Sequence, residues 1–256
     1  MGTILEVDNV GKHFGGLAAI SRLSLAVSEG EILGLIGPNG AGKTTLFNVI
    51  SGYFPPSAGR ILFQGRDVTG MQAHEIVRLG ITRTFQASAL FMKISVLENV
   101  FTGFHLSYAT SRWKRLLRSR SARSEEAQLR REALSILEFM GLGPLSGEAA
   151  ANLPHGHQRI LGISMALATH PKLLLLDEPM TGMNPVETEN MIGLVRQIRD
   201  RGITVMLVEH DMKAVMNLCD RVVVLNYGQK IAEGLPREIR ENRVVIEAYL
   251  GKQGAK

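Results

Sequence analysis

The stretch that decides the fold is residues 31–44, which read EILGLIGPNGAGKT. Residues 31–36 form a mostly apolar run, which is typical of a strand covered on both faces. Residues 37–44 match the pattern GxxxxGK[ST], in which a glycine-rich loop turns backbone N–H groups toward phosphate oxygens. A helical pattern over 43–51 follows and would add the positive end of its dipole. The order strand, loop, helix predicts a phosphate-binding loop in an α/β fold.

The rest of the chain extends this prediction. Further apolar runs and helical patterns predict a doubly wound sheet, with strands at 173–176, 203–208 and 222–225 and helices at 185–200 and 211–219. Short strands at 3–9, 22–27 and 60–64 predict an N-terminal antiparallel sheet. Between 96 and 142 the strand signals vanish and a period of 3.6 residues dominates. We expect one domain over 1–256, with a nucleotide-binding core at 1–86 and 153–256 and an inserted helical subdomain at 87–152.

Composition indicates the cellular compartment and the kinds of partner that the protein has. The 256 residues carry a formal net charge of +5, but six basic residues and no acid fall within 112–123, so the remainder is close to neutral. The one cysteine, Cys219, excludes an internal disulfide and is typical of a reducing cytosol. The start of the chain lacks a signal-peptide pattern, and the longest apolar runs are far short of the roughly 18 residues that span a bilayer. We therefore expect any membrane role to come through a partner.

Two acidic residues follow the apolar strand at 173–176, in the order Asp177-Glu178-Pro179. Open α/β sheets bind ligands at the carboxyl ends of their strands, so these carboxylates are expected near the phosphate loop. Because side chains alternate along a strand, the two cannot act from the same direction. Asp177 is predicted to hold Mg²⁺ through water and Glu178 to polarise the water that attacks the γ-phosphate. Lys43 would contact the β- and γ-phosphates, and the Thr44 hydroxyl would ligate Mg²⁺.

With these motifs the sequence resembles the ATP-binding subunit of an ABC transporter over essentially the whole chain. The closest similarity is to the branched-chain amino acid transport branch. It rests on four features: FGGL at 14–17, RTFQ at 83–86, the long helical insertion, and EIRENRVVIEAYLG at 238–251. The resemblance implies a P-loop NTPase core of the RecA-like type, with an antiparallel β subdomain and a helical subdomain.

The resemblance also implies roles for individual residues. Phe14 would stack on adenine, Gln86 would contact Mg²⁺ or the lytic water, and His210 would donate to the γ-phosphate. The catalytic set would then be Glu178, His210, Lys43 and Gln86, and the metal set Thr44, Gln86 and Asp177. The nucleotide-binding set would be Phe14, Gly37, Pro38, Asn39, Gly40, Ala41, Gly42, Lys43, Thr44 and Thr45.

Two segments depart from the family pattern. Most members read LSGGQ where this chain has the signature segment Leu153, Pro154, His155, Gly156, His157 and Gln158. Pro154 has neither the hydroxyl nor the N–H of the usual serine. After the carboxylates, Asn184 stands where the family usually has Asp. In this family both segments act on the ATP held by the opposite subunit, so both departures concern a site completed in the partner.

We expect an ATP-hydrolysing subunit that powers an importer of branched-chain or other hydrophobic amino acids from the cytoplasmic face of the inner membrane. Expected partners are transmembrane permease subunits, a second ATP-binding subunit and an extracytoplasmic substrate-binding protein, with no nucleic acid. The sequence leaves open whether the pair of ATP-binding subunits is a homodimer or a heterodimer. Alternatives are an importer of amides or urea, a soluble ABC-type ATPase of translation or DNA maintenance, and a small-molecule kinase.

The basic stretch 112–123 admits three interpretations. Trp113, Leu116 and Leu117 form a narrow apolar stripe on a predicted basic helix. The stretch could form a solvated helix face, it could contact anionic lipid headgroups, or it could contact nucleic acid. No recognition motif for nucleic acid accompanies the charge, which places the third interpretation last.

Overall fold

The computed structural model of the chain describes residues 2–84, 90–104 and 120–250. Contacts divide the chain into two compact units. The first comprises the described residues of Met1–Arg83, Lys172–Thr181 and Thr188–Lys256, and the second those of Thr84–Pro171 and Gly182–Glu187.

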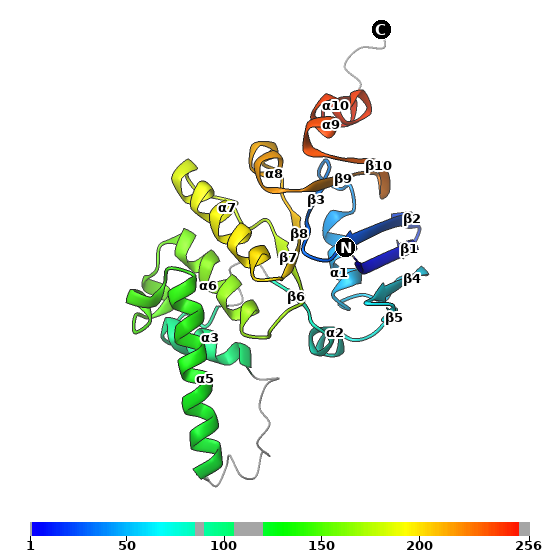
Figure 1. Ribbon diagram of the computed structural model, residues 1–256. Helices are drawn as coiled ribbons and strands as arrows, with labels where there is room; N and C mark the ends of the chain where they lie inside the picture. The colour runs from blue at the N-terminus through cyan, green and yellow to red at the C-terminus, as the bar shows by residue number, and fades with distance from the viewer. Residues whose placement is uncertain (1, 85–89, 105–119, 251–256) are drawn as a thin grey trace. The chain divides into compact units, whose positions relative to one another are not determined.

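The first unit holds a six-stranded sheet in the order β10-β9-β3-β8-β7-β6 (Figure 1). Its neighbouring strands run parallel except for the antiparallel pair of β9 and β10. Every residue of the three central strands is buried, which is why they appear in the sequence as continuous apolar runs. The strands are β3 (Ile32–Ile36), β6 (Ile81–Arg83), β7 (Leu173–Asp177), β8 (Thr204–Val208), β9 (Arg221–Asn226) and β10 (Gln229–Gly234).

A four-stranded antiparallel sheet in the order β2-β1-β4-β5 completes the strands of this unit. Its members are β1 (Thr3–Phe14), β2 (Leu17–Ser28), β4 (Ala58–Phe63) and β5 (Arg66–Asp67). One hydrophobic core joins both sheets to α1 (Lys43–Ile50), which buries Leu46, Phe47, Val49 and Ile50. The fold class expected from the sequence, an α/β core with an N-terminal antiparallel sheet, is confirmed.

The other helices of the first unit are short, apart from α7. They are α2 (Ala73–Leu79), α8 (Met212–Leu218), α9 (Pro236–Glu241), α10 (Arg243–Leu250) and the part of α7 (Pro185–Asp200) that begins at Thr188. Asp211 caps α8 by accepting hydrogen bonds from the N–H groups of Lys213 and Ala214.

The second unit is helical. Its core forms where α3 (Val96–Gly103), α5 (Arg120–Phe139) and α6 (His155–Leu167) pack together, with the short turns η3 (Gly143–Leu145) and η4 (Ala150–Asn152) beside them. Gly103 permits close packing, since a Cβ there would lie 2.4 Å from the Met165 carbonyl oxygen. The expected insertion ended at residue 152, whereas this unit extends to Pro171 and takes in residues 182–187. The difference arises because α6 shares the core of α3 and α5.

Among the described helices, none is both long and apolar enough to cross a membrane.

Candidate functional site

The phosphate loop lies between the end of β3 and the start of α1, and it depends on glycine. Gly37, Gly40 and Gly42 have φ angles of 149°, 78° and 100°. A Cβ on Gly37 would lie 2.1 Å from the Leu225 carbonyl oxygen, and one on Gly42 would lie 2.6 Å from that of Ala19. The backbone of the loop is therefore pressed against β9 and β2 more closely than any side chain would allow. Asn39 and Gly40 are exposed at its tip.

Lys43 bends back over this loop. Its Nζ donates hydrogen bonds to the carbonyl oxygens of Gly37, at 2.7 Å, and Pro38, at 3.0 Å. Burial lowers the pKa of Lys43, and the charges of Glu178 and Asp177 partly offset that effect. The ammonium group therefore lies in the electrostatic field of both carboxylates. Thr44 is exposed and Thr45 half-buried in the first turn of α1.

Asp177, at the end of β7, is held by an arginine that was not among the predicted site residues. Arg83 Nη2 lies 2.6 Å from Asp177 Oδ2, and the side chains are 7% and 8% exposed. Arg83 Nη1 donates a hydrogen bond of 2.5 Å to Asn48 Oδ1 on α1. The guanidinium carbon also lies 5.7 Å from the centroid of the Phe47 ring. Arg83 thus connects β6, β7 and the helix that follows the phosphate loop.

Glu178 has the left-handed conformation, with φ at 49°, which is uncommon for a residue with a side chain. Its N–H donates to the Val208 carbonyl oxygen at 2.9 Å, so the turn is anchored to β8. The Thr181 hydroxyl donates to Glu178 Oε2 at 3.3 Å. The left-handed turn breaks the strand geometry immediately after Asp177 and gives the two adjacent carboxylates different surroundings.

A buried carboxylate, Glu209, ties the next strand end to the same loop. Its side chain is 1% exposed and accepts hydrogen bonds from the N–H groups of Met180, at 2.8 Å, and His210, at 3.2 Å. Burial raises the pKa of Glu209 against the lowering effect of these bonds. The His210 imidazole is largely exposed, with Nδ1 3.9 Å from Glu209 Oε2. Glu209 therefore links the backbone of His210 to the segment after Glu178.

Phe14 closes the β1–β2 hairpin and is 43% exposed. Its ring packs edge-on against Phe54 at 5.4 Å between centroids, and Lys12 Nζ lies 5.1 Å from the centroid of the Phe14 ring. The same hairpin carries Ala19, whose carbonyl oxygen approaches Gly42 of the loop. An accessible aromatic face on this hairpin is suited to stack on a nucleotide base.

The signature segment lies in the second unit, at the start of α6. Pro154 is the residue before the first helical turn, and Gln158 Nε2 donates to the Leu153 carbonyl oxygen at 3.0 Å. Gly156 is buried, and a Cβ there would lie 3.2 Å from Glu187 Oε1, so a larger residue would displace that carboxylate. His155 and Gly182 are also close, because a Cβ on Gly182 would lie 3.6 Å from the His155 ring.

Asn184 caps the N-terminus of α7. Its Oδ1 accepts hydrogen bonds from the N–H groups of Val186, at 2.9 Å, and Glu187, at 3.0 Å. The Glu187 carboxylate in turn accepts from the Asn184 N–H at 2.9 Å. This reciprocal pair caps α7, and asparagine serves there about as well as the aspartate usual in the family.

Two sequence predictions fall outside the described residues. Gln86 lies in 85–89, and most of the basic stretch 112–123 lies in 105–119. Their roles stay predictions.

Comparison with known proteins decides the family. Residues 20–181 match the family described as ABC transporter, and residues 229–255 match the one described as branched-chain amino acid ATP-binding cassette transporter. The chain is 40% identical over 250 residues to the high-affinity branched-chain amino acid transport ATP-binding protein BraF of Pseudomonas aeruginosa, covering 97% of this chain and 98% of the relative. The chain belongs to the ABC transporter family of ATP-binding proteins.

Other relatives of this ABC protein carry related names. It is 40% identical to LivG of Escherichia coli K12, with the same coverage, and 38% identical to a probable LivG of Archaeoglobus fulgidus, covering 98% of this chain and 96% of the relative. Among solved structures, a nucleotide-free ATP-binding cassette from an ABC transporter has a TM-score of 0.87 at 33% identity. It covers 98% of this chain and 100% of its own. The resemblance stated from the motifs is confirmed.

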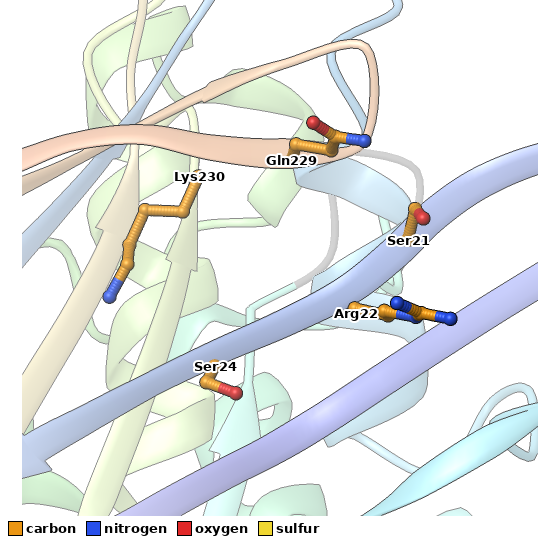
Figure 2. A pocket seen from close by; sticks show the side chains of 5 residues that line it. All are labelled: Ser21, Arg22, Ser24, Gln229 and Lys230. Carbon is orange, nitrogen blue, oxygen red and sulfur yellow. The ribbon is translucent and has the colours of Figure 1, made fainter.

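This ABC protein also has an open pocket that contains none of the predicted ATP-site residues. The pocket has a volume of about 560 Å³, and Figure 2 shows side chains from β2 and β10 around it. Its lining residues are Ser21, Arg22, Ser24, Gln229 and Lys230. The Lys230 ammonium already pairs with Glu233 at 2.6 Å.

Three residues of the first unit were not in the predicted site: Arg83, Asn48 and Glu209. Arg83 belongs to the RTFQ segment at 83–86 and Glu209 directly precedes His210, but the partners that hold both side chains are distant in sequence. Asn48 gave no motif signal. For Arg83 and Glu209, the sequence signal that could have been used is a charged residue directly at the end of an apolar strand.

Proposed function

We propose that this chain is the ATP-binding and ATP-hydrolysing subunit of an importer for branched-chain or other hydrophobic amino acids. The observation that carries the proposal is the Lys43 ammonium group, held over a glycine loop in the field of Asp177 and Glu178. The names of the relatives support the cargo class, as does the match of residues 229–255 to the branched-chain family.

The geometry fits a nucleoside triphosphate. The loop N–H groups, the start of α1 and Lys43 would bind the β- and γ-phosphates, and Phe14 would stack on the adenine. The close backbone approaches at Gly37 and Gly42 would restrict the loop before ATP binds and so lower the entropic cost of binding.

The residues also fit Mg²⁺. A buried carboxylate at a strand end, Asp177, and a hydroxyl in the first helical turn, Thr44, are hard oxygen ligands of the kind that Mg²⁺ prefers. Gln86 is proposed as a further ligand from its sequence motif. When bound, the ion would neutralise charge on the phosphates.

Glu178 would orient and polarise the attacking water, and His210 would donate to the γ-phosphate. The left-handed turn at Glu178 and the Glu209 bridge to the Met180 and His210 backbones support these roles, because each constrains the backbone that carries a proposed catalytic side chain. Catalysis would come mainly from positioning and charge stabilisation.

The proposed partners are permease subunits in the membrane, an extracytoplasmic substrate-binding protein and a second ATP-binding subunit, at the cytoplasmic face of the inner membrane. The signature segment 153–158 and residues 182–184 would complete the ATP site of that second subunit. Gly156 and the α6 N-terminus would still face a phosphate there, although Pro154 offers no hydroxyl.

The test is ATP hydrolysis by purified variants. Lys43→Ala should lose ATP affinity, since it removes the ammonium group proposed to bind the β- and γ-phosphates. Glu178→Gln should still bind a fluorescent trinitrophenyl analogue of ATP but hydrolyse ATP at least about 100-fold more slowly. Glu6→Gln, which alters an exposed carboxylate on β1, is the matched control and should behave as wild type. Full activity of Glu178→Gln would overturn the catalytic assignment.

Size measurement of Glu178→Gln with and without ATP, alone and mixed with candidate partner subunits, tests the proposed pairing. An assembly state that ATP never changes would exclude it. Uptake of labelled leucine and labelled urea by a deletion strain, with and without the gene restored, tests the cargo. If restoring the gene rescues uptake of urea but not of leucine, the cargo is an amide or urea and the amino acid proposal is wrong.

A further inference from the structure

The turn between β9 and β10 lies against the phosphate loop. It consists of Tyr227 and Gly228, whose φ angles of 46° and 75° are both positive, as in a type I′ hairpin turn. Tyr227 is exposed, whereas Gly228 is buried. Gly228 donates its N–H to the Ala41 carbonyl oxygen at 3.0 Å, and its own carbonyl oxygen accepts from the Ser21 N–H at 2.9 Å. The turn therefore joins the phosphate loop to β2.

Three segments of backbone meet at the Ala19 carbonyl oxygen. A Cβ on Gly42 would lie 2.6 Å from this atom, and one on Gly228 would lie 2.7 Å from it. A Cβ on Gly42 would also lie 3.5 Å from the Cα atom of Gly228, so the two glycines are neighbours. Only glycine at both positions lets the phosphate loop, β2 and the turn pack this closely.

The hydrogen bond from Gly228 orients the peptide that joins Ala41 to Gly42. No peptide bond among the described residues is cis, and in a planar trans peptide the C=O and the N–H point in opposite directions. Because the Ala41 carbonyl group is turned toward Gly228, the Gly42 N–H is turned away from the β9–β10 turn. This N–H is one of the loop groups that the proposed function assigns to phosphate.

We propose that Gly228 is a positioning residue for the phosphate loop: by holding the Ala41 carbonyl group outward, it directs the Gly42 N–H toward the phosphates of a nucleoside triphosphate. This inference rests on the proposed function, in which the loop binds ATP. It assigns to the β9–β10 turn a part in nucleotide affinity, although the turn itself supplies no phosphate ligand.

The contribution to affinity comes from preorganisation. If the turn moves away, the Ala41–Gly42 peptide loses the donor that fixes it, and phosphate binding must then order that peptide. Loss of one hydrogen bond corresponds to a weakening of about 3- to 10-fold in the dissociation constant. The loop would hold the phosphates before and during hydrolysis alike, so KM should rise by this factor while kcat stays within about twofold.

The test substitution is Gly228→Ala, and the β4–β5 turn supplies the matched control. That turn consists of Gln64 and Gly65, with φ angles of 49° and 74°, so Gly65→Ala introduces the same backbone strain. A Cβ on Gly65 would meet no other described residue within 4 Å, whereas one on Gly228 would collide with the Ala19 carbonyl oxygen. The two variants therefore differ in whether the new methyl group pushes the turn away from its neighbours.

The binding assay uses two ligands, trinitrophenyl-ATP and inorganic triphosphate. Their dissociation constants, and KM and kcat for ATP, are measured well below the thermal midpoint of each variant. Gly228→Ala should weaken both ligands by the same factor of about 3 to 10, because the loop contacts phosphate and not the base. Gly65→Ala should match wild type. A loss for the ATP analogue alone would place the effect at the base and contradict the proposal.

A spectroscopic measurement on the nucleotide-free protein tests the orientation of the peptide itself. The sequence contains only two Ala–Gly pairs, Ala41-Gly42 and Ala58-Gly59, so labelling carbonyl carbon in alanine and nitrogen in glycine selects two amide signals. Gly228→Ala should move the Gly42 signal and leave the Gly59 signal in place. Gly65→Ala should leave the Gly42 signal in place. A Gly42 signal that Gly228→Ala does not move would overturn the positioning role.

The outcomes separate this inference from the proposed function. If wild type binds neither ligand, the proposed function fails, whatever the Gly42 signal does. If wild type binds both ligands and Gly228→Ala binds them equally well, the positioning role alone is wrong.

Should Gly228→Ala not fold, amide exchange in wild type decides. Tyr227-Gly228 is the only Tyr–Gly pair in the sequence, so labelling carbonyl carbon in tyrosine and nitrogen in glycine isolates the Gly228 amide. If this hydrogen bond favours triphosphate binding, bound triphosphate must by linkage stabilise the hydrogen bond. Slow exchange at Gly228 that triphosphate slows further supports the role. Exchange at the unprotected rate, or exchange that triphosphate does not change, overturns it.

Discussion

Replacing Arg83 by methionine tests whether the buried ion pair with Asp177 holds the site together. The two charged groups lie 2.6 Å apart with 7% and 8% of their side chains exposed, so water cannot replace the lost partner. Methionine keeps similar length and apolar contact with Phe47 but removes the guanidinium group from the Asp177 carboxylate. Breaking a buried pair from one side costs about 3–5 kcal/mol in the free energy of unfolding. A typical domain has only about 5–15 kcal/mol in total, so the effect should be large.

The matched control is Arg60→Met. Arg60 also pairs with an aspartate, Asp8, at 3.0 Å, but the side chains are 59% and 32% exposed. Such surface pairs contribute about 1 kcal/mol or less, because water and salt screen them. The two substitutions are chemically identical and differ in burial.

The assay is urea unfolding at pH 7 without nucleotide or metal, followed by circular dichroism. Arg83→Met should lose at least about 2 kcal/mol more than Arg60→Met. Adding Asp177→Asn to Arg83→Met should cost less than the sum of the single changes, because both charges are then gone. The reasoning is refuted if Arg83→Met is no worse than Arg60→Met, or if the two site substitutions add independently.

Three further predictions concern other residues. Burial raises the pKa of Glu209 above its ordinary 4.5, so the folded state binds that proton more tightly, and the contribution of Glu209 to stability declines as pH rises through that window. Between pH 4 and 8 the thermal midpoint of wild type should therefore fall relative to that of Glu209→Gln, and a constant difference between the two proteins would contradict this prediction. Asn184→Ala should cost about 1 kcal/mol by removing the cap of α7, whereas Asn184→Asp should cost little in urea unfolding, and equal losses would exclude the capping role. Phe14→Ala should weaken ATP binding about 10-fold through lost stacking and leave affinity for inorganic triphosphate, which has no base, unchanged; a matching loss for triphosphate would argue against stacking.

Prediction from sequence succeeded where burial is uniform along an element. The strands β3, β7, β8 and β9 are buried on both faces along most of their length, and each was expected within one or two residues of its observed bounds. The strands β6 and β10 were not expected. The first has only three residues, and the second reads QKIAEG with no buried position, so neither carries a periodic signal.

Some residues of the candidate site could be predicted from the sequence and others could not. The phosphate loop, Asp177 and Glu178 belong to contiguous motifs, which local pattern can reveal. Arg83 and Asp177 are 94 positions apart in the sequence, and nothing local to Arg83 announces the partner on the neighbouring strand. The helix α6 likewise shows no local sign that it shares a core with α3 and α5, so its place in the second unit could not be predicted from its own residues.

The sequence by itself determined the family, the phosphate loop and the chemistry expected of its carboxylates, because backbone conformation at a glycine and charge at a strand end are local properties. Only the tertiary structure decided which residues surround them: Arg83 lies against Asp177, and Glu209 lies against the Met180 backbone. Each of these contacts joins segments far apart in the chain. They form only when the strands of the six-stranded sheet pair in register.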